Sequence, residues 1–377
     1  MKDIIIFGYD KIIKNKDLAI KSHMQLFNWF DIKKKIINQI DVKDKYYFTI
    51  DIFDINFFND LKKASELSLS KILLDDIRNR KAKILVLCCT ETIVHIKNIY
   101  KIFDIWSKKF NIPMNNIIFC SGDYSLDKYK NVNYIAFSIF EYWMRSAYIN
   151  RGINTSRIQM KRSIQNKTKR SKVFLNYNRR PTFDRCNLVY KLKQQNLFKY
   201  GLVSLGWKKE LLEPHVIKSF PDSFLDTLPI SFDDSNLEKN LFLSLEKKDF
   251  LNSYISLVSE SLVAPTVIFP TEKIWKSIMF LHPFIVIAEA GFLKQLKSFG
   301  YKTFSKWFDE SYDKEPDKNK RLDLLINEVK KITEMTHEEL QNMLVEMLPT
   351  LKYNLNTFLN RGKSKQFKKQ LKEKLIN

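Results

Sequence analysis

Residues 269–276 read Phe-Pro-Thr-Glu-Lys-Ile-Trp-Lys, and this segment places groups suited to a phosphorylated ligand close together. Thr271 is a candidate N-cap where a strand gives way to a helix, so Glu272 and Lys273 fall on the first helical turn. N–H groups at a helix start favour an anion, and a carboxylate there can accept both hydroxyls of a ribose. Lys273 and Lys276 share a helical face and can neutralise a diphosphate. The alternative is an ordinary capped amphipathic helix.

A second polar segment follows an apolar run in the sequence Phe-Leu-Asn-Tyr-Asn-Arg-Arg-Pro, residues 174–181. It predicts a strand that runs into a loop carrying Asn176, Asn178, Arg179 and Arg180. Open α/β sheets bind ligands at the carboxyl ends of their strands, and the planar fork of arginine matches a phosphate. The segment therefore predicts a phosphate-binding loop, with a solvated surface turn as the alternative.

The stretch TEKIWKSIMFLHPFIVIAEAGFLKQLKSFGYKTF resembles the donor-site region of GT-B glycosyltransferases of the fucosyltransferase and exostosin-like kind. It looks especially like a group of phage- and virus-encoded glycosyltransferase-like proteins. In such enzymes a Ser/Thr-Glu-Lys segment opens a helix, and a Pro followed by Phe or Val begins the next strand. The upstream run from Ile255 to Glu260 resembles a strand that carries an acidic residue near the donor, and residues 308–313 continue the likeness. It covers about residues 172–333.

This resemblance implies transfer of a sugar from a nucleotide-sugar donor to an acceptor in an interdomain cleft. By the likeness, Glu272 binds the nucleotide ribose, while Arg179, Arg180 and Lys273 stabilise the departing nucleoside diphosphate. GT-B enzymes need no bound metal for this step, which agrees with the absence of an Asp-x-Asp pair from the sequence. Gly-rich phosphate motifs and His-Glu-x-x-His are also absent, so we expect no metal and no bound cofactor.

The acceptor-side base would be a carboxylate or histidine at the carboxyl end of a strand in the first half of the chain. The sequence does not choose among the candidates there, which are Asp51, Glu91, His95, Asp123 and Glu141.

Short runs rich in Ile, Val, Phe and Tyr alternate with helix-length segments, as in parallel α/β sheets. The predicted strands are 4–7, 46–50, 84–87, 117–119, 134–137, 173–175, 202–205, 255–258 and 284–287, and the predicted helices include 67–80, 93–110, 182–195 and 317–332. We expect two Rossmann-like domains facing a cleft, a GT-B-like arrangement, with C-terminal helices that Pro349 breaks or kinks. The expected parts are an acceptor-side domain (1–150), a basic linker (151–172), a donor-binding domain (173–335) and the helices with a basic tail (336–377).

The formal net charge of +22 favours contact with a polyanion. The codon composition of an AT-rich genome would also produce a Lys-rich chain, whatever its function. The segment 151–172 has eight basic residues and no acidic one. The expected acceptor is a glycan or a protein, but this basic charge also favours two alternatives that involve nucleic acid. The alternatives are DNA with hydroxymethylated pyrimidines, which an enzyme must flip from the helix, or a nucleic-acid-binding protein that keeps the fold without catalysis.

The cellular location of the protein is predicted from three features that its sequence lacks. The four cysteines form no Cys-x-x-Cys pair, the N-terminus shows no signal-peptide pattern, and the apolar run from Ile278 to Ala288 is too short to span a bilayer. These features predict a cytoplasmic protein without a membrane span, in the host cytoplasm if the chain is viral.

Overall fold

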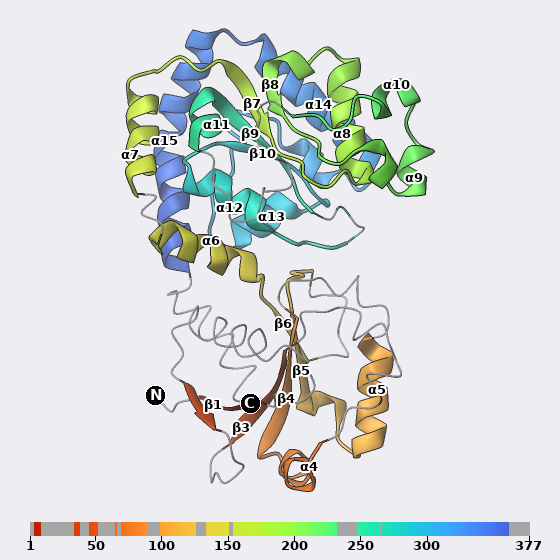
Figure 1. Ribbon diagram of the computed structural model, residues 1–377. Coiled ribbons are helices and arrows are strands. Elements are labelled where there is room, and N and C mark those ends of the chain that lie inside the picture. The colour runs from red at the N-terminus through yellow and green to blue at the C-terminus, as the bar shows by residue number, and fades with distance from the viewer. Residues whose placement is uncertain are drawn as a thin grey trace. The chain divides into compact units, whose positions relative to one another are not determined.

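The computed structural model describes residues 4–8, 34–37, 45–51, 65, 69–88, 99–125, 133–150, 154–231, 247–261, 263 and 266–361. The chain divides into two compact units, Met1–Tyr142 with Asn360–Asn377, and Trp143–Leu359. Each unit contains a parallel sheet with helices, which is compatible with a Rossmann-like fold (Figure 1).

The first unit is built on a six-stranded parallel sheet in the order β2-β1-β3-β4-β5-β6. Its strands are β1 (Ile4–Gly8), β2 (Lys34–Ile37), β3 (Tyr46–Asp51), β4 (Ala82–Cys88), β5 (Ile117–Ser121) and β6 (Asn133–Ala136). The helices are α4 (Lys71–Arg78), α5 (Ile99–Phe110), a 3-10 turn at Met114–Asn116, and the start of α6 (Ile139–Asn150). The direction of strand addition reverses between β1 and β3, which makes the sheet doubly wound.

The core of the first unit lies where α4 and α5 cover β3, β4 and β5. Ile77 of α4 and Trp106 of α5 are fully buried against Ile84 and Phe119 of the sheet. The run from Ile84 to Cys88 is buried without interruption, as expected of a parallel strand covered on both faces.

The second unit has a four-stranded parallel sheet in the order β10-β9-β7-β8. Its strands are β7 (Lys172–Asn176), β8 (Gly201–Val203), β9 (Ser253–Ser259) and β10 (Phe284–Ile287). The longer helices are α7 (Asn154–Gln165), α8 (Phe183–Gln194), α12 (Glu272–Met279), α13 (Phe292–Ser298), α14 (Lys318–Glu334) and α15 (His337–Asn360). Shorter helices are α9 (Pro214–Ile217), α10 (Asp222–Leu225), α11 (Lys247–Asn252) and 3-10 turns at 198–200, 209–211 and 311–314.

Helices cover both faces of this second sheet. The crossovers β7-α8-β8 and β9-α12-β10 run in opposite directions along the sheet, so right-handed connections place α8 and α12 on opposite faces. Figure 1 shows α8 with α14 on one side and α11 and α12 on the other. Trp275 of α12 is fully buried and stacks on Phe358 of α15 with ring centroids 6.0 Å apart. Trp275 is therefore a core residue.

Three features differ from the sequence prediction. The expected linker contains α7, whose Met160 and Ile164 lie four residues apart and are buried on one face. Strand β2 was not predicted, because its sequence Lys-Lys-Ile-Ile contains only two apolar residues. Pro349 does not break α15, which continues from His337 to Asn360. Burial of the neighbouring Leu348 and Leu351 offsets the hydrogen bond that a proline removes.

Among the described residues, no helix is both long enough and apolar enough to cross a membrane.

Candidate functional site at the carboxyl edge of the second sheet

The residues of the second unit that were predicted to bind the nucleotide-sugar donor lie at one end of its sheet. Strands β7 and β9 are neighbours, and the chain leaves them toward opposite edges, so the point between them is a topological switch point. Asn176 is the last residue of β7, Glu260 directly follows β9, and Glu272 begins α12. Open α/β sheets bind their ligands outside the carboxyl ends of the strands at such a point.

Asn176 and Asn178 hold the loop that follows β7 in place. The Asn176 side-chain amide donates to the main-chain oxygen of Leu257 at 2.6 Å and to the hydroxyl of Ser259 at 3.1 Å. The Asn178 amide donates in turn to Asn176 Oδ1. Both asparagines are fully buried, so they position the loop and tie β7 to β9.

The same loop approaches Gly206 closely. The Gly206 N–H donates to the main-chain oxygen of Asn178 at 3.0 Å. A Cβ atom at position 206 would stand 2.3 Å from the main-chain oxygen of Arg179, so this position requires glycine.

Arg179 and Arg180 are exposed on the loop, whereas Arg185 in the first turn of α8 is buried. The Arg180 guanidinium lies over the Trp207 ring, 5.4 Å from its centroid, and pairs with Glu213 at 3.3 Å. To bind a phosphate as predicted, Arg180 would have to leave these contacts with Trp207 and Glu213.

Arg185 joins the two halves of the site. Its guanidinium donates to the main-chain oxygens of Arg180 at 3.0 Å, Ser259 at 3.4 Å and Glu260 at 3.3 Å. Burial lowers the pKa of Arg185, while Glu272 and Glu260 oppose that change. Arg185 was not among the residues predicted for the site. Arg185 precedes the apolar residues Leu188 and Val189 by three and four positions. This spacing was the sequence signal that Arg185 lies on the buried face of the helix.

Glu260 is a buried carboxyl with a raised pKa. One of its oxygens, Oε2, accepts the Thr271 N–H at 3.2 Å and the Thr271 hydroxyl. Burial raises the pKa of Glu260 to about 7, although the nearby Lys273 charge and the Thr271 hydroxyl both lower it. Thr271 is the N-cap of α12, but its side chain bonds to Glu260 rather than to the helix N–H groups.

Glu272 and Lys273 form an ion pair at the start of α12. Lys273 Nζ lies 2.6 Å from Glu272 Oε1 and 2.8 Å from the Ser261 hydroxyl. Their side chains are 12% and 19% exposed, so a ligand at the surface can reach both. Burial raises the pKa of Glu272, but Lys273 and Lys276 outweigh it and lower the pKa overall. Glu272 is therefore an anion at neutral pH, whereas Glu260 is only partly ionised there.

Three buried polar atoms at this edge have no hydrogen-bond partner within the described part of the chain. They are Asn178 Oδ1, Glu260 Oε1 and Arg185 Nε. Buried polar groups in folded proteins nearly always pair with protein or with ordered water. The edge therefore offers acceptors and a donor positioned for water or a polar ligand.

The base candidates of the first unit are placed differently. Asp51 ends β3, while Glu91 and His95 lie outside the described residues. Asp123 is fully buried, and its Oδ1 accepts the Ser125 N–H at 2.9 Å and the Ser125 hydroxyl at 2.6 Å, so it stabilises a turn after β5.

Glu141 pairs with Arg361, and both side chains are buried. The neighbouring Tyr124 phenol is also buried, which raises its pKa to about 12, although Arg361 opposes that change. The Tyr124 oxygen accepts the Ser138 N–H at 3.0 Å. These contacts give Glu141 a structural role in the first unit.

No group of three or more His, Cys, Asp or Glu side chains among the described residues could hold a metal ion. Comparison with known proteins adds no identification, because no family model, curated protein or solved structure matches the chain.

Proposed function

We propose that the protein is a glycosyltransferase that takes its sugar from a nucleotide-sugar donor bound at the carboxyl edge of the second unit. The supporting observation is the convergence of the loop after β7, the buried Arg185 and the start of α12 on the switch point between β7 and β9. The Ser/Thr-Glu-Lys resemblance covers this same helix start.

In this proposal the leaving nucleoside diphosphate lies at the start of α12. Transfer replaces the bond between the anomeric carbon and the diphosphate oxygen by a bond from that carbon to the acceptor, so negative charge builds on the departing diphosphate oxygen. Lys273, Arg179 and the N–H groups of the α12 first turn would stabilise it. Glu272 would accept the ribose hydroxyls, because its lowered pKa keeps it ionised at neutral pH. The acceptor in this proposal is a glycan or a protein.

Binding of nucleoside diphosphates to the protein and to its Glu272→Gln variant tests the proposal. A glutamine keeps one acceptor oxygen and loses the charge-assisted bond, which costs about 1.5–3 kcal/mol. The variant should therefore bind the preferred diphosphate about 10- to 150-fold more weakly by calorimetry.

Glu338→Gln is the matched control, because Glu338 also lies in a helix first turn of the same unit but is exposed. Equal affinities in the protein and in Glu272→Gln would remove Glu272 from the site. Absence of binding by every nucleoside diphosphate and nucleotide sugar would refute the function.

DNA remains a second candidate acceptor, or the partner of a non-catalytic binding protein, because basic side chains of α7 and the following turn are exposed. Lys161, Arg162, Lys167 and Lys169 are not buried, as a phosphate-binding surface requires. Arg170, which the sequence grouped with them, is 1% exposed and donates to the main-chain oxygen of Ser253. It is therefore unavailable to a phosphate.

A further inference from the structure

Glu260 is a buried carboxyl at the candidate site to which the proposed transfer gives no role. It directly follows β9 and is 2% exposed. Its Oε2 accepts the Thr271 N–H at 3.2 Å and the Thr271 hydroxyl. The carboxyl is therefore directed at the N-cap of α12, the helix start where the diphosphate is proposed to bind.

The Thr271 hydroxyl links Glu260 to Lys273. Its proton is donated to Glu260, and its oxygen accepts from Lys273 Nζ at 3.2 Å. Lys273 also donates to the Ser261 hydroxyl at 2.8 Å and to Glu272 at 2.6 Å. An ammonium has three N–H donors, and these three acceptors match them. Through Thr271, Glu260 thus fixes one of the three acceptors that hold the Lys273 ammonium.

The two side-chain oxygens of Glu260 have different surroundings. Both Thr271 donors point at Oε2, whereas Oε1 is buried and has no hydrogen-bond partner among the described residues. An ionised carboxylate accepts hydrogen bonds at both oxygens, while a neutral carboxyl carries a proton on one of them. Oε1 is therefore the oxygen that holds the proton when Glu260 is neutral.

Glu260 faces charged groups from two helices. Burial raises its pKa to about 7, Lys273 of α12 opposes that change, and Glu272 adds to it. Arg185 of α8 also interacts with Glu260, and its guanidinium donates to the Glu260 main-chain oxygen at 3.3 Å. Lys273 is the one of these groups that a diphosphate at the start of α12 would contact.

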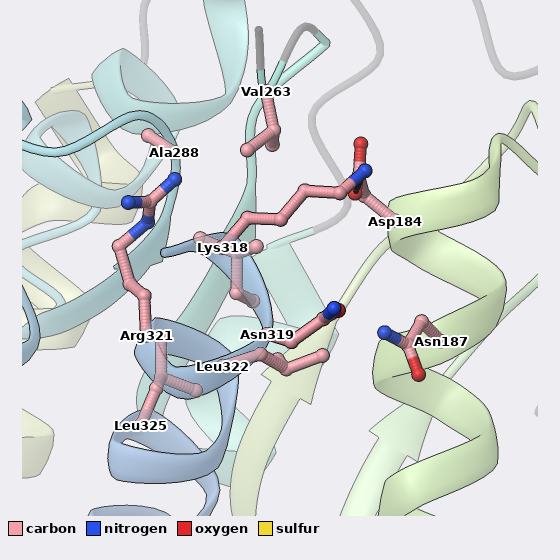
Figure 2. A pocket seen from close by; sticks show the side chains of 10 residues that line it. Asp184, Asn187, Val263, Ala288, Lys318, Asn319, Arg321, Leu322 and Leu325 are labelled. Atoms are coloured by element: carbon pink, nitrogen blue, oxygen red, sulfur yellow. Dashed lines mark hydrogen bonds and ion pairs between the residues drawn. The ribbon is translucent and has the colours of Figure 1, made fainter. Parts of the chain in front are cut away.

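The charged side chains farther along α8 and α14 are paired among themselves. They lie around a small hollow between the two helices, which has room for about one water molecule (Figure 2). Lys318 reaches Asp184 at 3.4 Å, and Arg321 pairs with the buried Glu289 at 2.9 Å. Because each pair is neutral overall, these groups add little net charge beside Glu260.

A bound diphosphate would change the ionisation of Glu260. Its negative charge engages the Lys273 ammonium and repels a second anion nearby. Two unit charges about 4 Å apart in water change an equilibrium constant about fivefold, and more where water is excluded. The neutral carboxyl is then favoured, and by reciprocity the ionised carboxyl weakens diphosphate binding.

We propose that Glu260 is a positioning residue of the diphosphate site, which holds the Lys273 ammonium in place through Thr271 and takes up a proton from solvent when the diphosphate binds. The inference rests on the proposed function, since it concerns the same diphosphate. It makes diphosphate binding stronger below neutral pH than above it.

Calorimetry of pyrophosphate binding at pH 7.5, in two buffers that differ in ionisation enthalpy, measures the proton uptake. The test variant is Glu260→Gln, which keeps an oxygen for Thr271 and cannot ionise. Glu338→Gln is the matched control, because Glu338 is an exposed carboxylate in a helix first turn of the same unit. Protonation of pyrophosphate itself is common to all three proteins and cancels in their differences.

With a fivefold coupling, the parent should take up about 0.4 of a proton more per pyrophosphate than Glu260→Gln. From pH 6 to pH 8.5, the pyrophosphate affinity of Glu260→Gln relative to the parent should rise about fourfold or more. Glu338→Gln should match the parent in both measurements. A purely structural Glu260 would change neither the proton uptake nor the pH profile.

Thr271→Val and Thr271→Ser test the link if Glu260→Gln fails to fold. Valine removes the hydroxyl between Glu260 and Lys273, so pyrophosphate should bind about fivefold more weakly. Serine keeps the hydroxyl and should retain the parent affinity.

Equal proton uptake by the parent and Glu260→Gln would overturn the inference, as would equal pyrophosphate affinity in Thr271→Val and Thr271→Ser. Pyrophosphate still binds in both of these outcomes, so the diphosphate site and the proposed function stand. Absence of binding by pyrophosphate and by every nucleoside diphosphate would instead overturn the proposed function and this role of Glu260 with it.

Discussion

Replacing Glu260 by glutamine tests the electrostatics of the candidate site without a ligand. The carboxyl of Glu260 is 2% exposed, with Oε2 bonded to Thr271 and Oε1 lacking a partner in the described structure. Glutamine preserves the shape and leaves one oxygen to accept from Thr271. It removes only the titration, so any difference in pH dependence belongs to this one group.

The magnitude follows from the pKa of Glu260, which burial raises from 4.5 to about 7. Between these values the folded protein keeps the proton that the unfolded chain has released. The free energy of unfolding therefore falls as pH rises through this window, by at most about 1.4 kcal/mol per pH unit. Above pH 7 the accumulated cost is about 3 kcal/mol.

Urea unfolding at pH 5 and pH 8 measures this cost. Near pH 5 the cost of the buried carboxyl should be below about 1 kcal/mol, because this pH lies only half a unit above the unfolded pKa of 4.5. At pH 8 the variant should be more stable by up to about 3 kcal/mol.

Other titrating groups cancel in the difference between parent and variant, and Glu338→Gln should show no such pH-dependent gain. If the stability difference between parent and Glu260→Gln stays constant from pH 5 to pH 8, the pKa of Glu260 is not raised, and the reasoning about the buried carboxyl is wrong.

Lys273→Met should weaken pyrophosphate binding about tenfold or more and reduce its dependence on salt, since it removes a cation from the proposed diphosphate site; calorimetry at two salt concentrations measures both, and unchanged affinity would exclude the residue. Arg361→Met leaves Glu141 buried without its partner, so the free energy of unfolding in urea should fall by about 3–5 kcal/mol; a change below about 1 kcal/mol would show that the pair is solvated. Substitution of Lys167 and Lys169 by glutamine should flatten the log–log salt dependence of duplex DNA binding by about one for each phosphate that these lysines neutralise. If the parent does not bind DNA at moderate salt, the basic composition has no such role.

The positions of most strands could be predicted from the sequence, because a parallel strand that is buried on both faces reads as a short apolar run. The run from Ile84 to Leu87 lies within β4, and the run from Phe284 to Ile287 is β10. Helix α7 was not predicted, because its buried face has few apolar residues. Met160 and Ile164 are buried there, and charged residues surround them in the sequence. Periodicity detects a helix only when its apolar stripe is dense.

The residue types of the candidate site were also readable from the sequence, but their partners were not. Thr271 was expected to cap α12, and only the structure shows its hydroxyl bonded to Glu260. Glu260 was expected to be an acidic residue near the donor, and only the structure shows that its side chain is buried, which raises its pKa to about 7. Local sequence sets which groups begin a helix, whereas burial depends on segments distant in the chain.

The sequence by itself determined a parallel α/β protein with a Thr-Glu-Lys helix start and a polar loop after a strand, because local apolar patterns and helix-capping preferences are short-range properties. The tertiary structure decided that these segments meet at the switch point between β7 and β9, that Arg185 joins them, and that Arg170 is withdrawn into the core. It also decided where a hollow forms between α8 and α14. Strand order and the packing of helices on a sheet depend on contacts between residues far apart in the chain, and no local pattern encodes them.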